Sequence, residues 1–118
     1  KEIGNIARRK LSQGMKGALI RIREDVGGYV LYVDDILYLS SDFVTKPGPQ
    51  LHVYLTTGVD PRDVPFPEET SIDLGPVQTV FGAQQYDVPH QDKPELYRTF
   101  VLWEKKLGRL YGFAQLSK

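Results

Sequence analysis

The feature that most restricts the fold of this chain is a series of short β-branched and aromatic runs separated by glycine, proline and aspartate. Residues 28–33 (GYVLYV) and 36–41 (ILYLSS) are two such runs, and only Asp34 and Asp35 lie between them. Two turn-favouring residues between two such runs predict a β-hairpin. Strands that recur at short intervals with turns of this kind suggest a sandwich or a barrel.

The same pattern continues along the rest of the chain and predicts further strands at residues 18–24, 51–56, 71–77, 84–89, 98–104 and 109–116. The alternation in residues 18–24 places Ile20 and Ile22 on one face, where we expect them to join the core. Residues 98–104 are apolar on both faces, as in a central strand covered on both sides. We therefore predict an all-β fold, a single-domain antiparallel β-sandwich of about eight strands over residues 1–118. Residues 1–14 fit an opening strand or a short helix.

Composition excludes several classes of site. A chain of 118 residues suits one domain. It contains no cysteine, which excludes disulfides, zinc–thiolate sites, iron–sulfur clusters and cysteine nucleophiles. The formal net charge is zero, so nothing argues for nucleic acid. Residues 26–95 carry 11 acidic and 3 basic side chains, which we interpret as a solvated acidic surface rather than a docking face.

The sequence shows no membrane span, because no stretch approaches the ~20 apolar residues that a span needs. The chain begins at Lys1, without an initiator methionine. We therefore expect further residues upstream, where a secretion signal or a membrane tether would lie.

His52 and Tyr54 form the first candidate site. In an alternating strand they share one face, opposite the face of Leu51 and Val53. We expect the face of His52 and Tyr54 to point outward. A His/Tyr pair on one face could hold a ligand or supply an axial ligand to haem iron. The interpretation we favour is a cross-strand surface ladder. Met15 and the other tyrosines are the remaining candidate iron ligands, whereas His90 in its polar loop is expected to be solvated.

A second candidate lies in the long loop of residues 57–70. It carries Asp60, Asp63, Glu68 and Glu69, and clustered carboxylates are what calcium requires. The spacing is not that of an EF-hand and the loop is stiffened by prolines, so calcium is a minor alternative here. No G-x-S-x-G elbow, G-x-G-x-x-G fingerprint or P-loop occurs in the chain.

Four segments together resemble the DM-thirteen domain family in sequence and spacing: GPQLHVYLTTGVDP (48–61), IDLGPVQT (72–79), GAQQYDVP (82–89) and LYRTFVLWEKKLGRLYGFAQL (96–116). The hairpin of residues 28–43 is similar to the hairpin of that family. The resemblance implies an extracytoplasmic β-rich domain, of a kind often found beside DOMON domains and proposed to take part in electron transfer.

The resemblance also draws attention to Glu104. The family pattern usually has a Trp-Cys pair where this chain has Trp103 and Glu104, and the proposed redox role depends on that cysteine. Glutamate has no thiol chemistry, so the redox role cannot be transferred to this chain. The interpretation we favour is that the Glu104 carboxylate is solvated near Lys105 and Lys106, where its charge contributes little to stability. The alternative is a carboxylate buried beside a tyrosine, which would mark a pocket. Trp103 is expected to anchor the core.

Three functions are compatible with these observations. The first is a non-enzymatic extracytoplasmic module that binds a partner protein or a small ligand, with the thiol role lost. The second is an electron-transfer accessory domain that binds a cofactor such as haem. A hydrolytic enzyme is the least favoured, because no catalytic motif is present.

Overall fold

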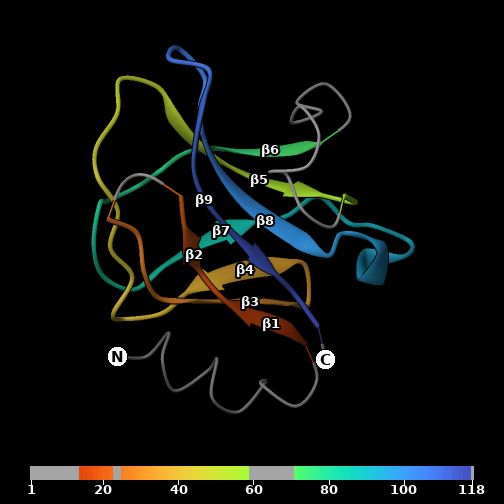
Figure 1. Cartoon of the computed structure of the whole chain (residues 1–118). Helices are drawn as coiled ribbons and strands as arrows, with labels where there is room; N and C mark the ends of the chain where they lie inside the picture. Colours follow the sequence, from red (N-terminus) through yellow and green to blue (C-terminus); the bar gives the residue numbers. More distant parts are fainter. Residues whose placement is uncertain (1–13, 23–24, 59–70, 118) are drawn as a thin grey trace.

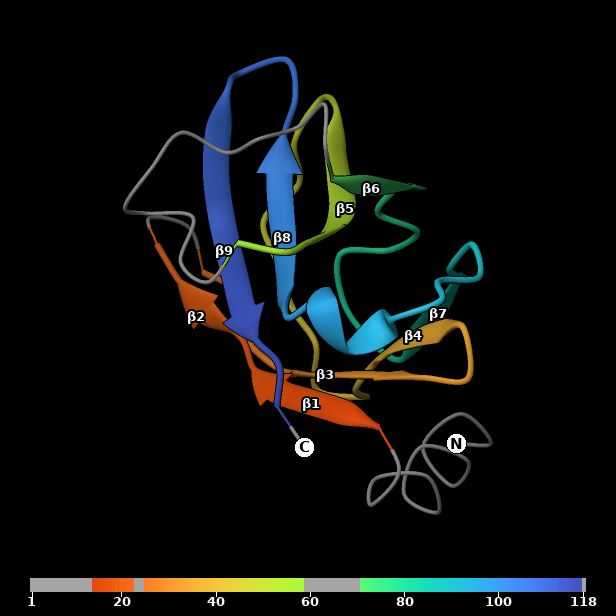
Figure 2. The same ribbon diagram turned by 90° about the vertical axis from the view of Figure 1, so that its right-hand side faces the viewer.

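The chain folds into two antiparallel β-sheets that pack face to face (Figures 1 and 2). The computed structural model describes residues 14–22, 25–58 and 71–117. One sheet has four strands, in the order β1 (Met15–Ala18), β3 (Tyr29–Val33), β4 (Ile36–Leu39) and β7 (Gln84–Asp87). The other has five, in the order β2 (Ile20–Arg21), β9 (Arg109–Gln115), β8 (Thr99–Glu104), β5 (Leu51–Thr56) and β6 (Ile72–Pro76). A 3₁₀ helix, η2 (Pro94–Leu96), precedes β8. None of the described helical segments is long and apolar enough to cross a membrane.

The main hydrophobic core lies between the two sheets. The four-stranded sheet contributes Val30, Leu37 and Leu39, and the five-stranded sheet contributes residues such as Val53 and Phe100, all at most 1% exposed. Burial of apolar side chains from both sheets in one layer is what defines a sandwich. The predicted all-β sandwich is therefore confirmed, with nine strands in the described residues against the eight expected.

The predicted hairpin at Asp34 and Asp35 is present and joins β3 to β4. Val33 pairs with Ile36, so the two aspartates form a two-residue loop. Their φ angles are 54° and 61°. A tight hairpin turn of the primed type requires positive φ at both central residues, and aspartate tolerates this better than most residues do.

The predicted strand at residues 18–24 is divided between the two sheets. Ala18 pairs with Tyr29 in the four-stranded sheet, whereas Ile20 pairs with Phe113 in the five-stranded sheet. The chain changes sheets at Leu19, which packs against the main core. Ile20 is consequently 39% exposed, so its predicted place in the core is wrong. Ile22 packs beside Tyr54 on the outer face of the five-stranded sheet.

Strand β8 is the central strand that the sequence predicted. Phe100 and Leu102 face the main core, Val101 faces the other side, and all three are 0% exposed. On the neighbouring β5, Tyr54 and Thr56 are 1% and 3% exposed. They share the face opposite Leu51 and Val53, as predicted, but the expectation that this face is exposed is wrong.

Candidate functional site

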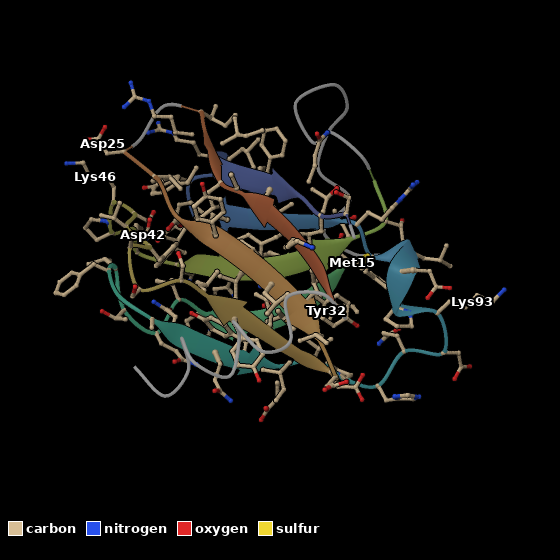
Figure 3. The ribbon with its side chains drawn as sticks, turned by 90° about the horizontal axis from the view of Figure 1, so that it is seen from below. Met15, Asp25, Tyr32, Asp42, Lys46 and Lys93 are labelled. Carbon is tan, nitrogen blue, oxygen red and sulfur yellow. The ribbon has the colours of Figure 1, made fainter. Side chains whose placement is uncertain are left out.

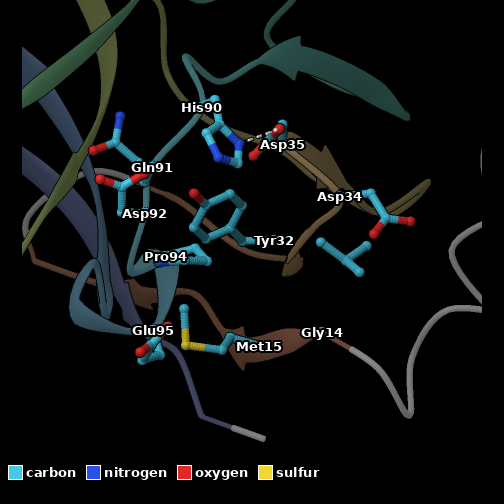
Figure 4. Close-up of a pocket in the computed structure, with 11 residues that line it drawn as sticks. Gly14, Met15, Tyr32, Asp34, Asp35, His90, Gln91, Asp92, Pro94 and Glu95 are labelled. Atoms are coloured by element: carbon cyan, nitrogen blue, oxygen red, sulfur yellow. Dashed lines mark hydrogen bonds and ion pairs between the residues drawn. The ribbon is translucent and has the colours of Figure 1, made fainter.

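A cavity of about 420 Å³ lies at the end of the sandwich where the β3–β4 turn, the start of β1 and the loop between β7 and β8 meet (Figure 4). Its walls come from sequence positions far apart in the chain. The lining residues are Gly14, Met15, Tyr32, Val33, Asp34, Asp35, His90, Gln91, Asp92, Pro94 and Glu95.

Two contacts hold the β7–β8 loop against the hairpin. The Val88 N–H donates to the backbone oxygen of Asp35 at 2.9 Å. The His90 Nδ1 lies 3.0 Å from the Asp35 carboxylate. This hydrogen bond and the negative charge of Asp35, with a smaller effect of Asp92, raise the pKa of His90 above its ordinary value. The His90 side chain is 75% exposed, so the pair positions the loop and contributes little to stability.

Tyr32 provides the buried polar group of the cavity. The residue is 3% exposed, and its hydroxyl finds no hydrogen-bond partner among the residues that the structure describes. In Figure 4 the hydroxyl points toward the side of the cavity where Gln91 and Asp92 lie. Burial, with smaller effects of Asp35 and Tyr97, raises the pKa of the phenol, so it is neutral at physiological pH. A buried hydroxyl without a partner costs about 1–3 kcal/mol.

The charged residues at the cavity are mainly acidic. Asp34, Asp35, Asp92 and Glu95 line it, and no lysine or arginine is among the eleven lining residues of the described chain. No group of three or more histidine, aspartate or glutamate side chains in the described residues is arranged to hold a metal ion. The cavity therefore combines dispersed negative charge with apolar surface.

Glu104, at the position that resembles the cysteine of the family pattern, is fully buried. It is 0% exposed at the end of β8, on the same face as Phe100 and Leu102. Its Oε2 accepts the Gln50 N–H at 2.8 Å, and its Oε1 accepts the Lys106 N–H at 2.9 Å. The favoured prediction of a solvated carboxylate is therefore wrong, because main-chain donors replace the water that a charged group needs.

The alternative placement of Glu104, buried beside a tyrosine, is the one that the structure contains. A Cβ on Gly48 would collide with the Glu104 carboxylate and lie 3.1 Å from the Tyr111 hydroxyl. The Tyr111 hydroxyl in turn donates to the backbone oxygen of Pro47 at 3.3 Å. The space beside Glu104 is thus filled by the main chain of the β4–β5 loop, so this carboxylate holds two loops together rather than marking a pocket.

His52 lies on the outer face of the five-stranded sheet. Its Nδ1 is 2.9 Å from Asp73 on β6, and the Lys105 Nζ is 3.7 Å from the same carboxylate. Burial opposes the ionisation of Asp73, but hydrogen bonds from His52 and Gly75 and the charges of His52 and Lys105 outweigh it. The pKa of Asp73 consequently lies below its ordinary value.

The predicted His/Tyr pair is only partly available to a ligand. The His52 and Tyr54 rings are 6.3 Å apart and tilted by 31°. Tyr54 is buried with Val101 and Phe113, and Trp103 packs against this outer cluster rather than in the main core. The prediction of a surface ladder is therefore wrong for Tyr54, whereas the His52 side chain remains 20% exposed.

The structure separates the candidates that the sequence suggested. His52 pairs with Trp103, and Leu51 pairs with Glu104, so His52 and Glu104 face opposite sides of the same sheet. Met15 lies in the core between the sheets and lines the cavity, so it is not on the face of His52. The four acidic residues of the calcium alternative, Asp60, Asp63, Glu68 and Glu69, lie outside the described residues.

Sequence reasoning missed the cavity itself. Turn geometry accounts for Asp34 and Asp35, and the His90 side chain is 75% exposed, so neither local pattern indicates a cavity. The one available signal was the acidic excess of residues 26–95, which was interpreted as surface. No local pattern indicates that Asp35 and His90, 55 positions apart, are in contact.

A family model described as electron transfer DM13 matches residues 19–116. Neither a curated protein nor a solved structure was found to match the chain.

Proposed function

Since the chain belongs to the electron transfer DM13 family, we propose that it is a non-enzymatic, extracytoplasmic member of that family that binds a ligand in the cavity beside Tyr32. The ligand is a small molecule or a side chain of a partner protein. The thiol redox role is lost, since the chain has no cysteine and Glu104 at the matching position is fully used in main-chain hydrogen bonds.

The unpartnered hydroxyl of Tyr32 is the observation that carries this proposal. A folded protein rarely leaves a buried hydroxyl without a partner, because the unmade hydrogen bond costs free energy. Such a group beside a cavity is explained if a ligand supplies the partner. Binding is favoured over hydrolysis because no serine, threonine or cysteine nucleophile is among the described residues that line the cavity.

The extracytoplasmic location rests on the family resemblance alone. It is tested by fractionating cells that express the full-length gene and locating the domain with an antibody. Recovery in the soluble cytoplasmic fraction would refute this part of the proposal and leave the binding site unaffected.

Binding at the cavity is tested by NMR with three probes that share one four-carbon stem: n-butylammonium, n-butyrate and n-butanol. The expected result is a saturable shift of the amide signals of residues 32–35, 90–93 and 95 with at least one probe. The signals around His52, on the other sheet, serve as an internal control. Absence of saturable shifts with all three probes would overturn the proposed site.

Haem binding in an electron-transfer accessory domain is the second candidate, and the His52–Asp73 contact favours it. In the neutral form of His52 that donates its Nδ1–H to Asp73, 2.9 Å away, the lone pair lies on Nε2, as in many metal-ligating histidines. The contribution of Tyr54 is withdrawn, because that ring is buried. Mixing the protein with hemin should give a shifted Soret band that disappears in His52→Ala and persists in the control His90→Ala. An unchanged spectrum in His52→Ala would exclude this candidate.

A further inference from the structure

The chemistry of the cavity identifies the kind of group that fits it, on the premise that the cavity is a binding site as proposed above. Asp35, whose carboxylate is paired with His90, comes from the hairpin, and Asp92 and Glu95 come from the β7–β8 loop. Acidic side chains from two segments therefore outnumber the one histidine at the cavity. The nearby Lys93 extends away from Met15 and Tyr32 into solvent (Figure 3). A cavity with these walls attracts positive charge and repels anions.

The Tyr32 hydroxyl adds a hydrogen-bond requirement to the charge. Its oxygen is a free acceptor within the described residues, and its proton is a free donor. An ammonium group carries three donors and no acceptor, so it can donate to the phenol oxygen and to neighbouring carboxylates at the same time. The phenol then becomes a partner of the ligand rather than an unpaired buried group.

A metal cation fits the walls less well. The carboxylates do not form a group that could hold a metal ion, on the residues described, whereas Ca²⁺ requires six to eight oxygens close together. The cavity also presents apolar side chains, Met15, Val33 and Pro94. Apolar walls of this kind suit the methylene stem of an organic cation, since such stems bury well while the charged head keeps its polar partners.

The geometry points to an alkylammonium group as the ligand of this cavity, with the head beside the Tyr32 hydroxyl and the stem against Met15 and Pro94. Two sources carry this group: a free small amine, and the lysine side chain of a partner protein. They share one recognition chemistry, and a binding experiment can distinguish them.

The test compares the affinities of the three four-carbon probes by NMR titration at pH 7.5. We expect n-butylammonium to bind at least about tenfold more tightly than n-butanol, since a hydrogen bond to a charged group contributes about 1.5–3 kcal/mol. We expect n-butyrate not to bind. If n-butanol or n-butyrate binds as well as the ammonium, the inference is refuted and the proposed site stands. If none of the three probes binds, both the ammonium inference and the proposed binding site are refuted.

Variants establish whether the named groups are responsible. Tyr32→Phe removes one oxygen and no carbon, and should weaken the binding of n-butylammonium about tenfold or more. It should weaken the binding of n-butanol less, because a hydrogen bond between neutral groups contributes less than one to a charged group. Asp92→Asn should lower the affinity for n-butylammonium and reduce the salt dependence of its binding. Tyr29→Phe is the matched control, because Tyr29 lies on the same strand and is 61% exposed. Equal ammonium affinity in Tyr32→Phe and Tyr29→Phe would overturn the assignment.

The final comparison separates the two sources of the ligand. 1,4-Diaminobutane represents a free amine, and lysine blocked at both backbone ends represents a side chain of a partner. Tighter binding of the diamine indicates a small-molecule ligand, and tighter binding of the blocked lysine indicates a protein partner. Failure of both, with n-butanol still bound, would refute the ammonium assignment.

Discussion

Replacement of Glu104 by alanine is expected to lower the free energy of unfolding by about 2–4 kcal/mol. The carboxylate is fully buried and accepts two short hydrogen bonds, from the Gln50 N–H at 2.8 Å and from the Lys106 N–H at 2.9 Å. Alanine leaves both amides without a partner, at about 1–3 kcal/mol each. Part of this cost is offset, because the variant no longer buries a charge. Glu104→Gln keeps the shape and one acceptor oxygen, so its expected loss is smaller, about 1–2 kcal/mol.

This change is measured by urea unfolding at pH 7.5, monitored through the fluorescence of the single tryptophan, Trp103. Small domains have about 5–15 kcal/mol of stability in total, so Glu104→Ala should still fold, with a melting temperature lower by about 10 °C or more. Glu95→Ala is the control, because it removes an exposed carboxylate and should change stability by less than about 0.5 kcal/mol. If Glu104→Ala is as stable as Glu95→Ala, the carboxylate does not hold the two loops together, and our account of this position is refuted.

Three further predictions concern His90, Asp73 and Gly48. The pKa of His90 measured by NMR should lie above 6.5, and Asp35→Asn should lower it. Because the pKa is raised in the folded state, His90→Gln should be less stable than the native protein below about pH 6.5. This difference should vanish as the pH rises through the raised pKa. The pKa of Asp73 is lowered from 3.8, so the stability lost in Asp73→Asn should be present above that pH and vanish as pH falls through the lowered pKa, as measured by urea unfolding at several pH values. Gly48→Ala should lower the melting temperature, because its Cβ would collide with Glu104, and a melting temperature equal to that of the native protein would contradict the close approach.

The local part of this fold could be predicted from the sequence. Alternation and turn residues identified β3, β4, β5, β8 and β9 within a few positions. The pair Asp34 and Asp35 specified its turn, because few residues adopt positive φ. Alternation along residues 98–104 also predicts the observed face of Glu104, the one that carries Phe100 and Leu102. These features depend on residues within about ten positions of one another, which is the range over which such patterns carry information.

The rest depends on pairings that the sequence does not encode locally. Residues 18–24 alternate without interruption, yet Ala18 pairs with Tyr29 and Ile20 with Phe113, so the change of sheet is decided by distant strands. Tyr54 was assigned to the correct face, but alternation cannot say whether a face is covered. The sequence predicts a solvated Glu104 because one of its donors, the Gln50 N–H, is 54 positions away. A buried charge is recognised only when its donors are known.

The cavity and the Glu104 contacts are separate features of the molecule, and this separation can be tested. The turn after Glu104 and the β3–β4 turn beside the cavity lie apart in both views (Figures 1 and 2). Tyr32→Phe removes a buried hydroxyl without a partner, so it should leave stability unchanged or raise it by about 1 kcal/mol while it weakens the ammonium probe. Glu104→Gln should do the reverse, with lower stability and unchanged affinity.

The double variant Tyr32→Phe/Glu104→Gln completes the argument. Changes in the free energy of unfolding at distant sites without shared partners add within about 0.3–0.5 kcal/mol. The change in the double variant should therefore equal the sum of the two single changes, and its affinity for the ammonium should equal that of Tyr32→Phe. A larger deviation would mean that the position resembling the family cysteine and the cavity are coupled. In that case the loss of the thiol could not be treated independently of ligand binding, and the proposal that this chain binds a ligand at a site unrelated to Glu104 would have to be abandoned.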